Sequence, residues 1–372
     1  MRFFGKVTFL TLVAIISNLS EITAQDHVGS TPEYDPIEIT STPDVILTQH
    51  WAMPTLLNPA ATGNIDFIRI RGGARIDYLG SADSPKNYLA VADSPFKLLG
   101  KRIGAGILVN SQTYDLFQNL QVGAQGSYKL KIKNSSLSIG IQLGYYHSKF
   151  KGSKLKIKHD NMDPGENEGT ENEEGEPGSE EDSGTSGEDK KDGYYNDFPT
   201  HDIAGGAFDM GVGVRYEHPK FNVGISVMHL MNSKVKLKKD GESATDLQSV
   251  ESKLPMTLYF DAGGNIDINN SLFTLQPSLL IGTDFSDFTG VVNMRATYNH
   301  KITFGLNYRY NRAAGVMAGL SIKNFYIGYN WEYDYKMNPK GSTGNHELVL
   351  GFQFKMDMSG KSNFSHRSIR IM

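Results

Sequence analysis

Hydrophobic and polar side chains alternate along residues 119–130, which read NLQVGAQGSYKL. Leu120 and Val122 fall on one side of an extended chain, and Gln121 and Gly123 fall on the other. This period of two is typical of a β-strand with one apolar and one polar face. Because the polar face carries small or hydrogen-bonding residues, the pattern favours a sheet with lipid on one side and a polar interior on the other.

The same alternation recurs along the chain and predicts about 14 strands, each near the roughly 9–11 residues that a tilted transmembrane strand needs. These strands are expected at residues 65–78, 86–93, 103–111, 119–130, 136–148, 208–216, 221–230, 256–266, 272–283, 288–298, 301–310, 315–322, 325–335 and 346–356. Charged residues on the polar faces, such as Asp209 and Arg215, are costly in a β-sandwich core but not in a wet lumen. The pattern therefore predicts an all-β fold, a transmembrane outer-membrane β-barrel of about 14 antiparallel strands.

Connection lengths between these strands give a second indication of a barrel. Outer-membrane barrels alternate short periplasmic turns with longer outer loops. Counted from a periplasmic N-terminus, the even-numbered connections are short at residues 131–135, 217–220, 267–271, 299–300 and 323–324, with residues 94–102 as a longer exception. The long connections, at residues 152–203, 231–255 and 336–345, all belong to the odd-numbered set, although the odd-numbered connection at residues 311–314 is short. A soluble β-sandwich adhesin, the rival all-β reading, gives no reason for this sorting.

The first 24 residues form a separate unit. Arg2 and Lys6 flank the start of an apolar run at residues 7–16, and small residues at Thr23 and Ala24 suit a cleavage site. These features favour a secretory signal peptide at residues 1–24 over a membrane anchor, which needs roughly 18 apolar residues. We therefore expect export to the outer membrane of a Gram-negative cell.

The remaining chain divides by composition. Residues 25–64 are expected to form a periplasmic lead-in, residues 65–356 the barrel and residues 357–372 a C-terminal tail. Within the barrel, Asp160 to Asp192 carry 14 acids against two lysines and almost no apolar residue. Such a segment cannot bury enough surface to fold, so residues 152–203 are expected to be a disordered extracellular loop. This loop is either simply solvated or a weak binder of divalent cations.

No motif for enzymatic chemistry emerges. The chain has no cysteine, which excludes disulfides, zinc–thiolate sites and thiol nucleophiles. Its ten histidines are scattered, and the sequence lacks H-E-x-x-H, G-x-S-x-G and Walker A patterns. Residues 158–163, KHDNMD, lack the glycine and glutamate of a calcium loop. We expect no catalytic residue, no metal site, no cofactor and no nucleic-acid partner.

Charged residues on the polar faces are candidates for the lumen. The candidates are Asp209, Arg215, Arg295 and Arg309, with Asp261 and Glu332 as further acids that the arginines could meet across the barrel. Such pairs either stabilise a polar interior or line a path for solutes. The first reading is favoured, because a large polar interior needs internal pairing in any case.

One motif carries a family resemblance. Residues 49–60 read QHWAMPTLLNPA, with Gly63 soon after. A glutamine followed by an aromatic residue and then L-x-N-P-A resembles the opening of the PorP/SprF family, outer-membrane proteins of the type IX secretion system of Bacteroidetes. Later stretches are similar to the family as well: LQPS at residues 275–278, GLNYR at 305–309, IGY at 327–329 and HELVL at 346–350.

The resemblance implies a function that the strand pattern does not. It implies a barrel that assists the export or surface attachment of an adhesin with a C-terminal sorting domain, beside other type IX secretion components, some of them linked to gliding motility. The expected partners are thus outer-membrane lipid, the secretion machinery and the secreted adhesin. An outer-membrane transporter or porin for small solutes is the alternative function.

The motif itself precedes the first strand. Its candidate binding residues are Gln49, Trp51, Pro54, Asn58, Pro59 and Ala60. The two prolines stiffen the chain and favour extended geometry before each of them. We expect this segment at or inside the periplasmic mouth, where it plugs the lumen, caps the barrel or docks on a partner.

Overall fold

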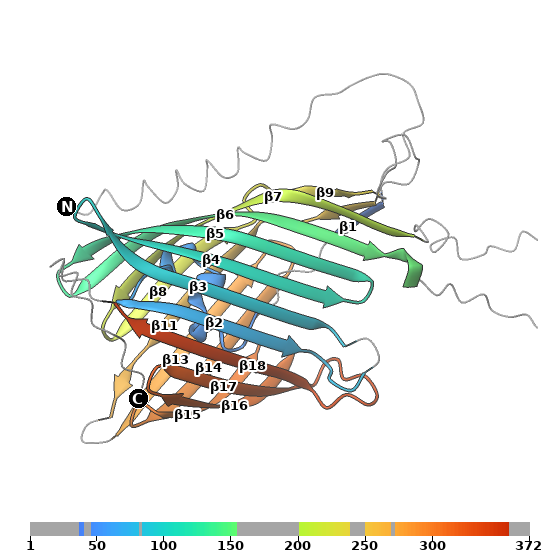
Figure 1. The fold of residues 1–372 in the computed structure, drawn as a ribbon. Helices are drawn as coiled ribbons and strands as arrows, with labels where there is room; N and C mark the ends of the chain where they lie inside the picture. Colours follow the sequence, from blue (N-terminus) through green and yellow to red (C-terminus); the bar gives the residue numbers. More distant parts are fainter. Residues whose placement is uncertain are drawn as a thin grey trace, which may run out of the picture. The chain divides into compact units, whose positions relative to one another are not determined.

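Fourteen antiparallel strands form a closed barrel in the computed structural model (Figure 1). The structure describes residues 37–40, 46–81, 84–154, 201–238, 250–268 and 272–356. Each strand pairs with its neighbour in the sheet, and β11 pairs with both β8 and β13, so the ladder returns on itself. Among the described residues, no helix has the length and hydropathy to span a membrane.

All fourteen predicted strands are confirmed, with most boundaries shifted by a few residues. The barrel strands are β2 Phe67–Ile76, β3 Lys86–Leu98, β4 Lys101–Tyr114, β5 Phe117–Ile132, β6 Ser135–Lys151, β7 Asp202–His218, β8 Phe221–Met228, β11 Thr257–Gly264, β13 Phe273–Thr283, β14 Phe288–Tyr298, β15 Ile302–Arg309, β16 Ala313–Ile322, β17 Phe325–Asp334 and β18 Asn345–Lys355. The short β12 (Ile266–Asp267) prolongs the β11–β13 hairpin.

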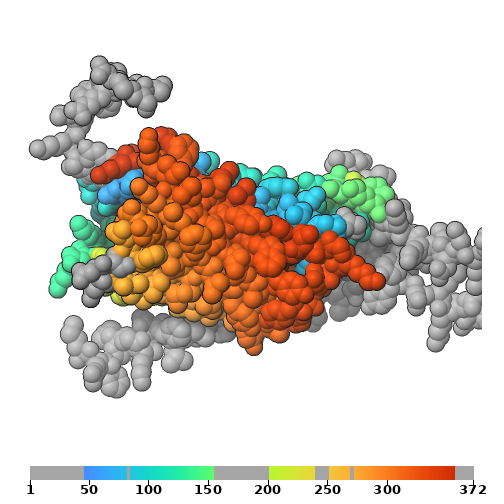
Figure 2. All heavy atoms as spheres, turned by 90° about the horizontal axis from the view of Figure 1, so that it is seen from below, coloured from blue at the N-terminus to red at the C-terminus, as the bar shows by residue number. Residues whose placement is uncertain are grey.

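The two faces of each strand follow the predicted alternation. In β6, Ile139 and Leu143 are 52% and 56% exposed, whereas Ser138 and Gln142 between and beside them are buried. Figure 2 shows the wall built from the C-terminal strands, orange to red. In β15 of this wall, Phe304 and Leu306 are 61% and 65% exposed. A continuous apolar exterior of this kind is unfavourable in water and suits contact with lipid.

The two ends of the barrel differ in the length of their connections. At one end, called the short-turn end, tight turns join β3 to β4, β5 to β6, β7 to β8 and β16 to β17. At the opposite end, called the long-connection end, residues 77–85, 152–201, 229–256 and 335–344 join their strands. Most of the predicted acidic loop, at residues 155–200, lies outside the described part of the chain.

One connection is shorter in the structure than the sequence predicted. We expected residues 94–102 to be a loop, but Pro95 and Phe96 stay paired in β3. The turn is only Leu99 and Gly100, both with positive φ (51° and 76°), as in the tight turns that suit β-hairpins. The short-turn end is therefore more uniform than the sequence indicated.

A second, three-stranded sheet was not predicted. It consists of β1 (Ile37–Thr40), β10 (Val250–Lys253) and β9 (Lys234–Leu237), in the order β1-β10-β9. Val235 and Leu237 pack with Phe150 and Ile203 of the barrel wall in a buried apolar cluster. Because β9 and β10 belong to the connection between β8 and β11, this sheet lies at the long-connection end.

Candidate functional site

A segment just before the first barrel strand lies inside the lumen. Residues 46–64, here called the plug, form three short 3-10 helices inside the barrel: η1 His50–Ala52, η2 Pro54–Leu56 and η3 Pro59–Ala61 (Figure 1, blue). Most plug residues are buried. Pro54 and Pro59 each begin a helix, a position where the missing N–H costs nothing, and they break the segment into separate turns.

The plug runs from one end of the barrel towards the other. Arg309, the last residue of β15 at the long-connection end, donates a hydrogen bond to the Ile46 carbonyl (3.0 Å). Gly63 donates its N–H to Asp93 (2.7 Å), and β2 then starts at the short-turn end. Residues 46–64 occupy the lumen, and β1 lies at the long-connection end.

Buried carboxylates hold the start of the plug. Glu347 accepts the backbone N–H groups of Thr48 and Gln49, both at 2.8 Å. Arg75 bridges Glu347 (3.3 Å) and Glu332 (2.8 Å), and all three side chains are almost completely buried. We call these five residues the clasp. It pairs charges that would be costly alone and satisfies backbone donors that the plug cannot satisfy itself.

Asn58 fastens the middle of the plug. Its side-chain oxygen caps η3 by accepting the Ala60 N–H (2.9 Å). Its amide nitrogen donates to the Val214 carbonyl of β7 (3.3 Å) and lies 3.5 Å from an Asp261 oxygen. Ser226 of β8 donates to the Leu57 carbonyl (2.6 Å). The N-P-A sequence thus anchors the plug in the lumen through one helix cap and several contacts with the wall.

Glycines on the inner wall let the plug approach closely. A Cβ on Gly140 of β6 would lie 2.3 Å from the Ala60 nitrogen, and one on Gly213 of β7 would lie 2.2 Å from the Asn58 oxygen. A Cβ on Gly104 of β4 would lie 2.1 Å from the Thr62 carbonyl. No side chain fits at such separations. The period-two pattern thus places glycine on the polar face because a second piece of chain lies against it.

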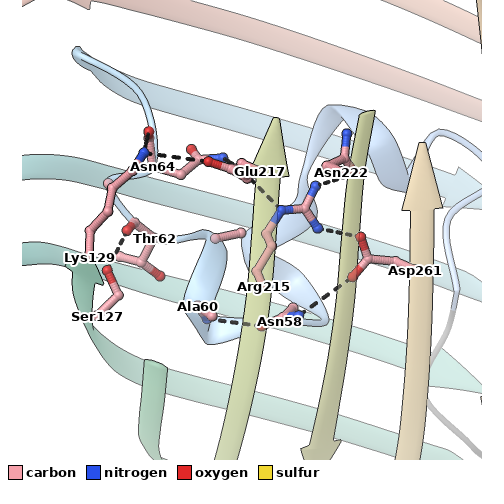
Figure 3. A network of polar contacts seen from close by, with 12 residues as sticks. Asn58, Ala60, Thr62, Asn64, Ser127, Lys129, Arg215, Glu217, Asn222 and Asp261 are labelled. Atoms are coloured by element: carbon pink, nitrogen blue, oxygen red, sulfur yellow. Dashed lines mark hydrogen bonds and ion pairs between the residues drawn. The ribbon is translucent and has the colours of Figure 1, made fainter. Parts of the chain in front are cut away.

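A polar network continues from Asn58 to the short-turn end (Figure 3). Arg215 pairs with Asp261 and with Glu217 (3.1 Å) and donates to Asn222 (2.7 Å). Lys129 pairs with Glu217 (3.4 Å) and donates to the carbonyl of Asn64. The network ties the end of the plug to four strands at once, since these residues belong to β5, β7, β8 and β11.

A second buried ion pair secures the last plug residues. Arg69 of β2 pairs with Asp93 of β3 (2.6 Å), and Arg69 also donates to the Ala61 carbonyl (2.9 Å). Asp93 in turn accepts the Gly63 N–H. Gly63 has φ +59°, and a Cβ there would lie 2.6 Å from Gly104 Cα, so only glycine suits this turn.

Trp51 lies among cations and aromatic rings. It packs edge-on to Tyr326 of β17 with 5.6 Å between ring centroids. The Arg295 guanidinium lies 3.7 Å from the Trp51 ring centroid, and that of Arg71 lies 6.0 Å from the Tyr326 ring centroid. Trp51, Pro54 and Arg295 border a cavity of about 390 Å³ beside the plug.

The lumen candidates take different partners from one another. Arg215 meets Asp261, and Arg309 lies 3.8 Å from Glu332, as two of the considered pairings suggested. Asp209 instead pairs with His229 (2.9 Å) and accepts from Gln121 (3.3 Å). Arg295 has no acidic partner among the described residues and stacks on Trp51 instead.

Several residues that hold the plug were not singled out from the sequence. They are Thr48, Arg69, Arg75, Asp93 and Glu347 and the wall glycines Gly104, Gly140 and Gly213. The sequence did offer a signal for Arg75 and Glu347, because both are charged residues at inward-facing positions of strands with a period of two. Thr48 carries no such signal, because it precedes the strands.

The fold and the lumen together define a class: a membrane-embedded β-barrel closed by its own N-terminal segment. The chain also matches the family model described as "Type IX secretion system membrane protein PorP/SprF" over residues 40–352. It therefore belongs to the PorP/SprF family and is an outer-membrane barrel component of the type IX secretion system. This is a family of secretion-system membrane barrels and not an enzyme family.

Solved structures of low similarity share the barrel architecture. The outer-membrane protein Omp33 of Acinetobacter baumannii is 8% identical with a TM-score of 0.40, covering 79% of this chain and 100% of its own. A FadL homologue of Pseudomonas aeruginosa is 13% identical with a TM-score of 0.46, covering 81% and 93%. Comparison with curated proteins gave no match. At these scores the fold rests on the closed ladder and the family on the sequence match.

Alanine at a wall glycine should loosen the plug. Because a Cβ on Gly140 overlaps the Ala60 nitrogen and the Pro59 carbonyl, Gly140→Ala should lower the free energy of unfolding by about 1–3 kcal/mol. Equilibrium unfolding in detergent measures this loss. Gly126→Ala in β5 is the matched control, because nothing lies within 4 Å of its Cβ position. Equal stability of the two variants would contradict a tight contact between plug and wall.

Breaking the clasp should cost more than breaking an exposed ion pair. Glu347→Ala leaves Arg75 with a buried charge and removes the acceptor of two plug N–H groups, so we expect a loss of about 3–5 kcal/mol. Asp202→Ala removes the partner of Lys149, whose side chain is 40% exposed, and should change stability little. Denaturant titration of both variants tests the contrast, which is lost if Glu347→Ala unfolds like the wild type.

Proposed function

We propose that this barrel assists the export or surface attachment of an adhesin that carries a C-terminal sorting domain, and that it does so without acting as an open pore. The observation that supports this most is the plug, which contacts the barrel wall from Arg309 at one end to Asp93 towards the other. A lumen filled in this way offers surfaces to partners and leaves little room for passage. The family membership supplies the secretion context.

The plug counts against the alternative function of a small-solute porin. Transport requires a continuous aqueous path or a plug that moves readily. Here Glu332, Glu347 and Arg75 are buried around the start of the plug, and separating them means exposing or isolating charges. A role in gliding motility is a narrower form of the proposal, in which the attached adhesin is a motility adhesin.

The two barrel ends support a proposed orientation. Long connections face the outside of the cell in outer-membrane barrels, and short turns face the periplasm. We therefore assign the long-connection end to the cell surface. Since β1 pairs with β10 at that end, this orientation places β1 at the cell surface. The signal peptide and the tail at 357–372 lie outside the described residues.

The N-P-A motif is proposed to act mainly as the plug anchor. Gln49, Asn58, Pro59 and Ala60 are buried in the lumen, where a partner cannot touch them without displacing the plug. Trp51 and Pro54 differ, because they border a cavity. A direct partner contact of the motif is therefore proposed only for these two residues.

Deleting the gene in its native cell should remove one large adhesin from the surface. We expect the adhesin to be lost from protease-accessible material on whole cells and to return with the wild-type gene. The purified wild-type barrel should show no steady conductance in planar bilayers. Normal surface display together with reduced uptake of a small solute and steady conductance would favour the porin and overturn the proposal.

Cysteine labelling should place β1 at the cell surface. The natural chain has no cysteine, so a single introduced thiol reports its own position. Thr40→Cys in β1 should react with a membrane-impermeant maleimide on intact cells, as should Lys340→Cys in the long connection 335–344. Asn134→Cys in the β5–β6 turn should react only after the outer membrane is permeabilised. The orientation is wrong if Thr40→Cys behaves like Asn134→Cys.

A further inference from the structure

The cavity beside the plug opens towards the short-turn end. Its volume is about 390 Å³, and its lining includes His300 from the β14–β15 turn and Lys323 and Asn324 from the β16–β17 turn. Deeper in the lumen it is bordered by Trp51 and Leu57 of the plug. The cavity is therefore reachable from the short-turn mouth without movement of the plug.

Two arginines in this cavity have no acidic partner among the described residues. Arg295 is only 7% exposed, yet its guanidinium contacts a ring and no carboxylate. Arg71 likewise approaches the Tyr326 ring. Buried Nε atoms of both arginines lack a hydrogen-bond partner in the described part of the protein. Arg295 is buried and Arg71 is half-buried, and a cation shielded from water without a counter-charge is costly, so the two together point to a ligand that supplies one.

The charge of the lining is strongly one-sided. Asp261 is the single acid among the described residues that border the cavity, and Arg215 neutralises it. Arg71, Arg295 and Lys323 remain as cations around the same space. The plug adds further unsatisfied polar atoms, because both ring nitrogens of His50 and the indole N–H of Trp51 are buried without partners in the described part of the protein.

The rings hold the arginines in fixed positions. Trp51 and Tyr326 pack together; the Arg295 guanidinium lies over the Trp51 ring at 3.7 Å from its centroid, and that of Arg71 lies near the Tyr326 ring at 6.0 Å. A stacked guanidinium keeps its N–H groups free in its own plane, where they can bind a carboxylate with two parallel hydrogen bonds. Two guanidinium groups that border one cavity suit a ligand with more than one carboxylate.

We propose that this cavity binds an acidic peptide segment that enters from the short-turn mouth, with its carboxylates on Arg71 and Arg295. The volume exceeds what a single inorganic oxyanion fills, and Leu57, Leu280 and Trp51 offer apolar contacts to the rest of a peptide. A groove at the same end has Asp66 as its one acid, paired with Arg102, and its lysines add positive potential that attracts acidic chains to the mouth: Lys97, Lys101, Lys131 and Lys355, with Lys129 paired to Glu217. The inference does not depend on the proposed export role or on the membrane orientation.

Trp51 fluorescence provides a direct test. The chain has two tryptophans, so Trp331→Phe leaves Trp51 as the reporter beside Arg295. The full mature chain with this change is titrated in detergent with acetyl-Asp-Glu-Asp-amide, with the neutral acetyl-Asn-Gln-Asn-amide and with sodium phosphate. We expect a saturable change with the acidic peptide and none with the neutral one. Phosphate should act only at much higher concentration.

Substitutions of the two arginines test whether the peptide binds in this cavity. Arg295→Gln and Arg71→Gln should each raise the Kd of the acidic peptide at least tenfold, whereas Lys340→Gln, which removes a charge at the opposite end, should leave it unchanged. Heat-modifiable gel mobility confirms folding of each variant. An equal response to the neutral peptide, full displacement by equimolar phosphate, or no response at all would each overturn the proposal, whether or not the arginine variants fold.

Discussion

The interaction on which the rest of the structure depends is the pairing of plug backbone with buried charged side chains of the wall. The plug consists of short 3-10 turns, which satisfy few of their own polar groups. Inside a barrel these groups need partners, and Glu347, Ser226 and Arg69 supply them. The carboxylates and guanidiniums in turn pair with one another. The polar inner face is thus a set of partners for one specific piece of chain.

This arrangement changes what the barrel offers to other molecules. A water-filled channel provides a path for solutes. A barrel occupied by a plug instead exposes two separate surfaces, one at each mouth, with different side chains. The long-connection mouth carries the additional sheet β1-β10-β9, and the short-turn mouth carries lysines and a cationic cavity. Such a molecule is suited to holding partners on its two sides, which agrees with membership in a secretion machine.

Much of the fold could be predicted from the sequence, because period-two alternation is a local property. Ile139 and Gln142 reveal their sides of β6 without knowledge of any neighbour. The end of β3 was placed too early, because residues 94–98 stay paired although Pro95 cannot donate a ladder hydrogen bond. The strands β1, β9 and β10 are too short to show a period. The contacts of the plug could not be predicted, since Glu347 and Thr48 are separated by 299 positions and meet only when the barrel closes.

The seam of the barrel has a consequence for biogenesis. The ladder joins its first and last strands, β2 and β18, and Glu347 lies on that seam opposite Arg75. The hairpin of β17 and β18 thus brings the acid that accepts the backbone N–H groups of Thr48 and Gln49 in the plug. Because the plug lies inside the closed ladder and contacts strands on several sides, we expect the wall to close around a plug that is already in place. Pairing of β18 with β2 and binding of the plug by Glu347 then take place in the same step.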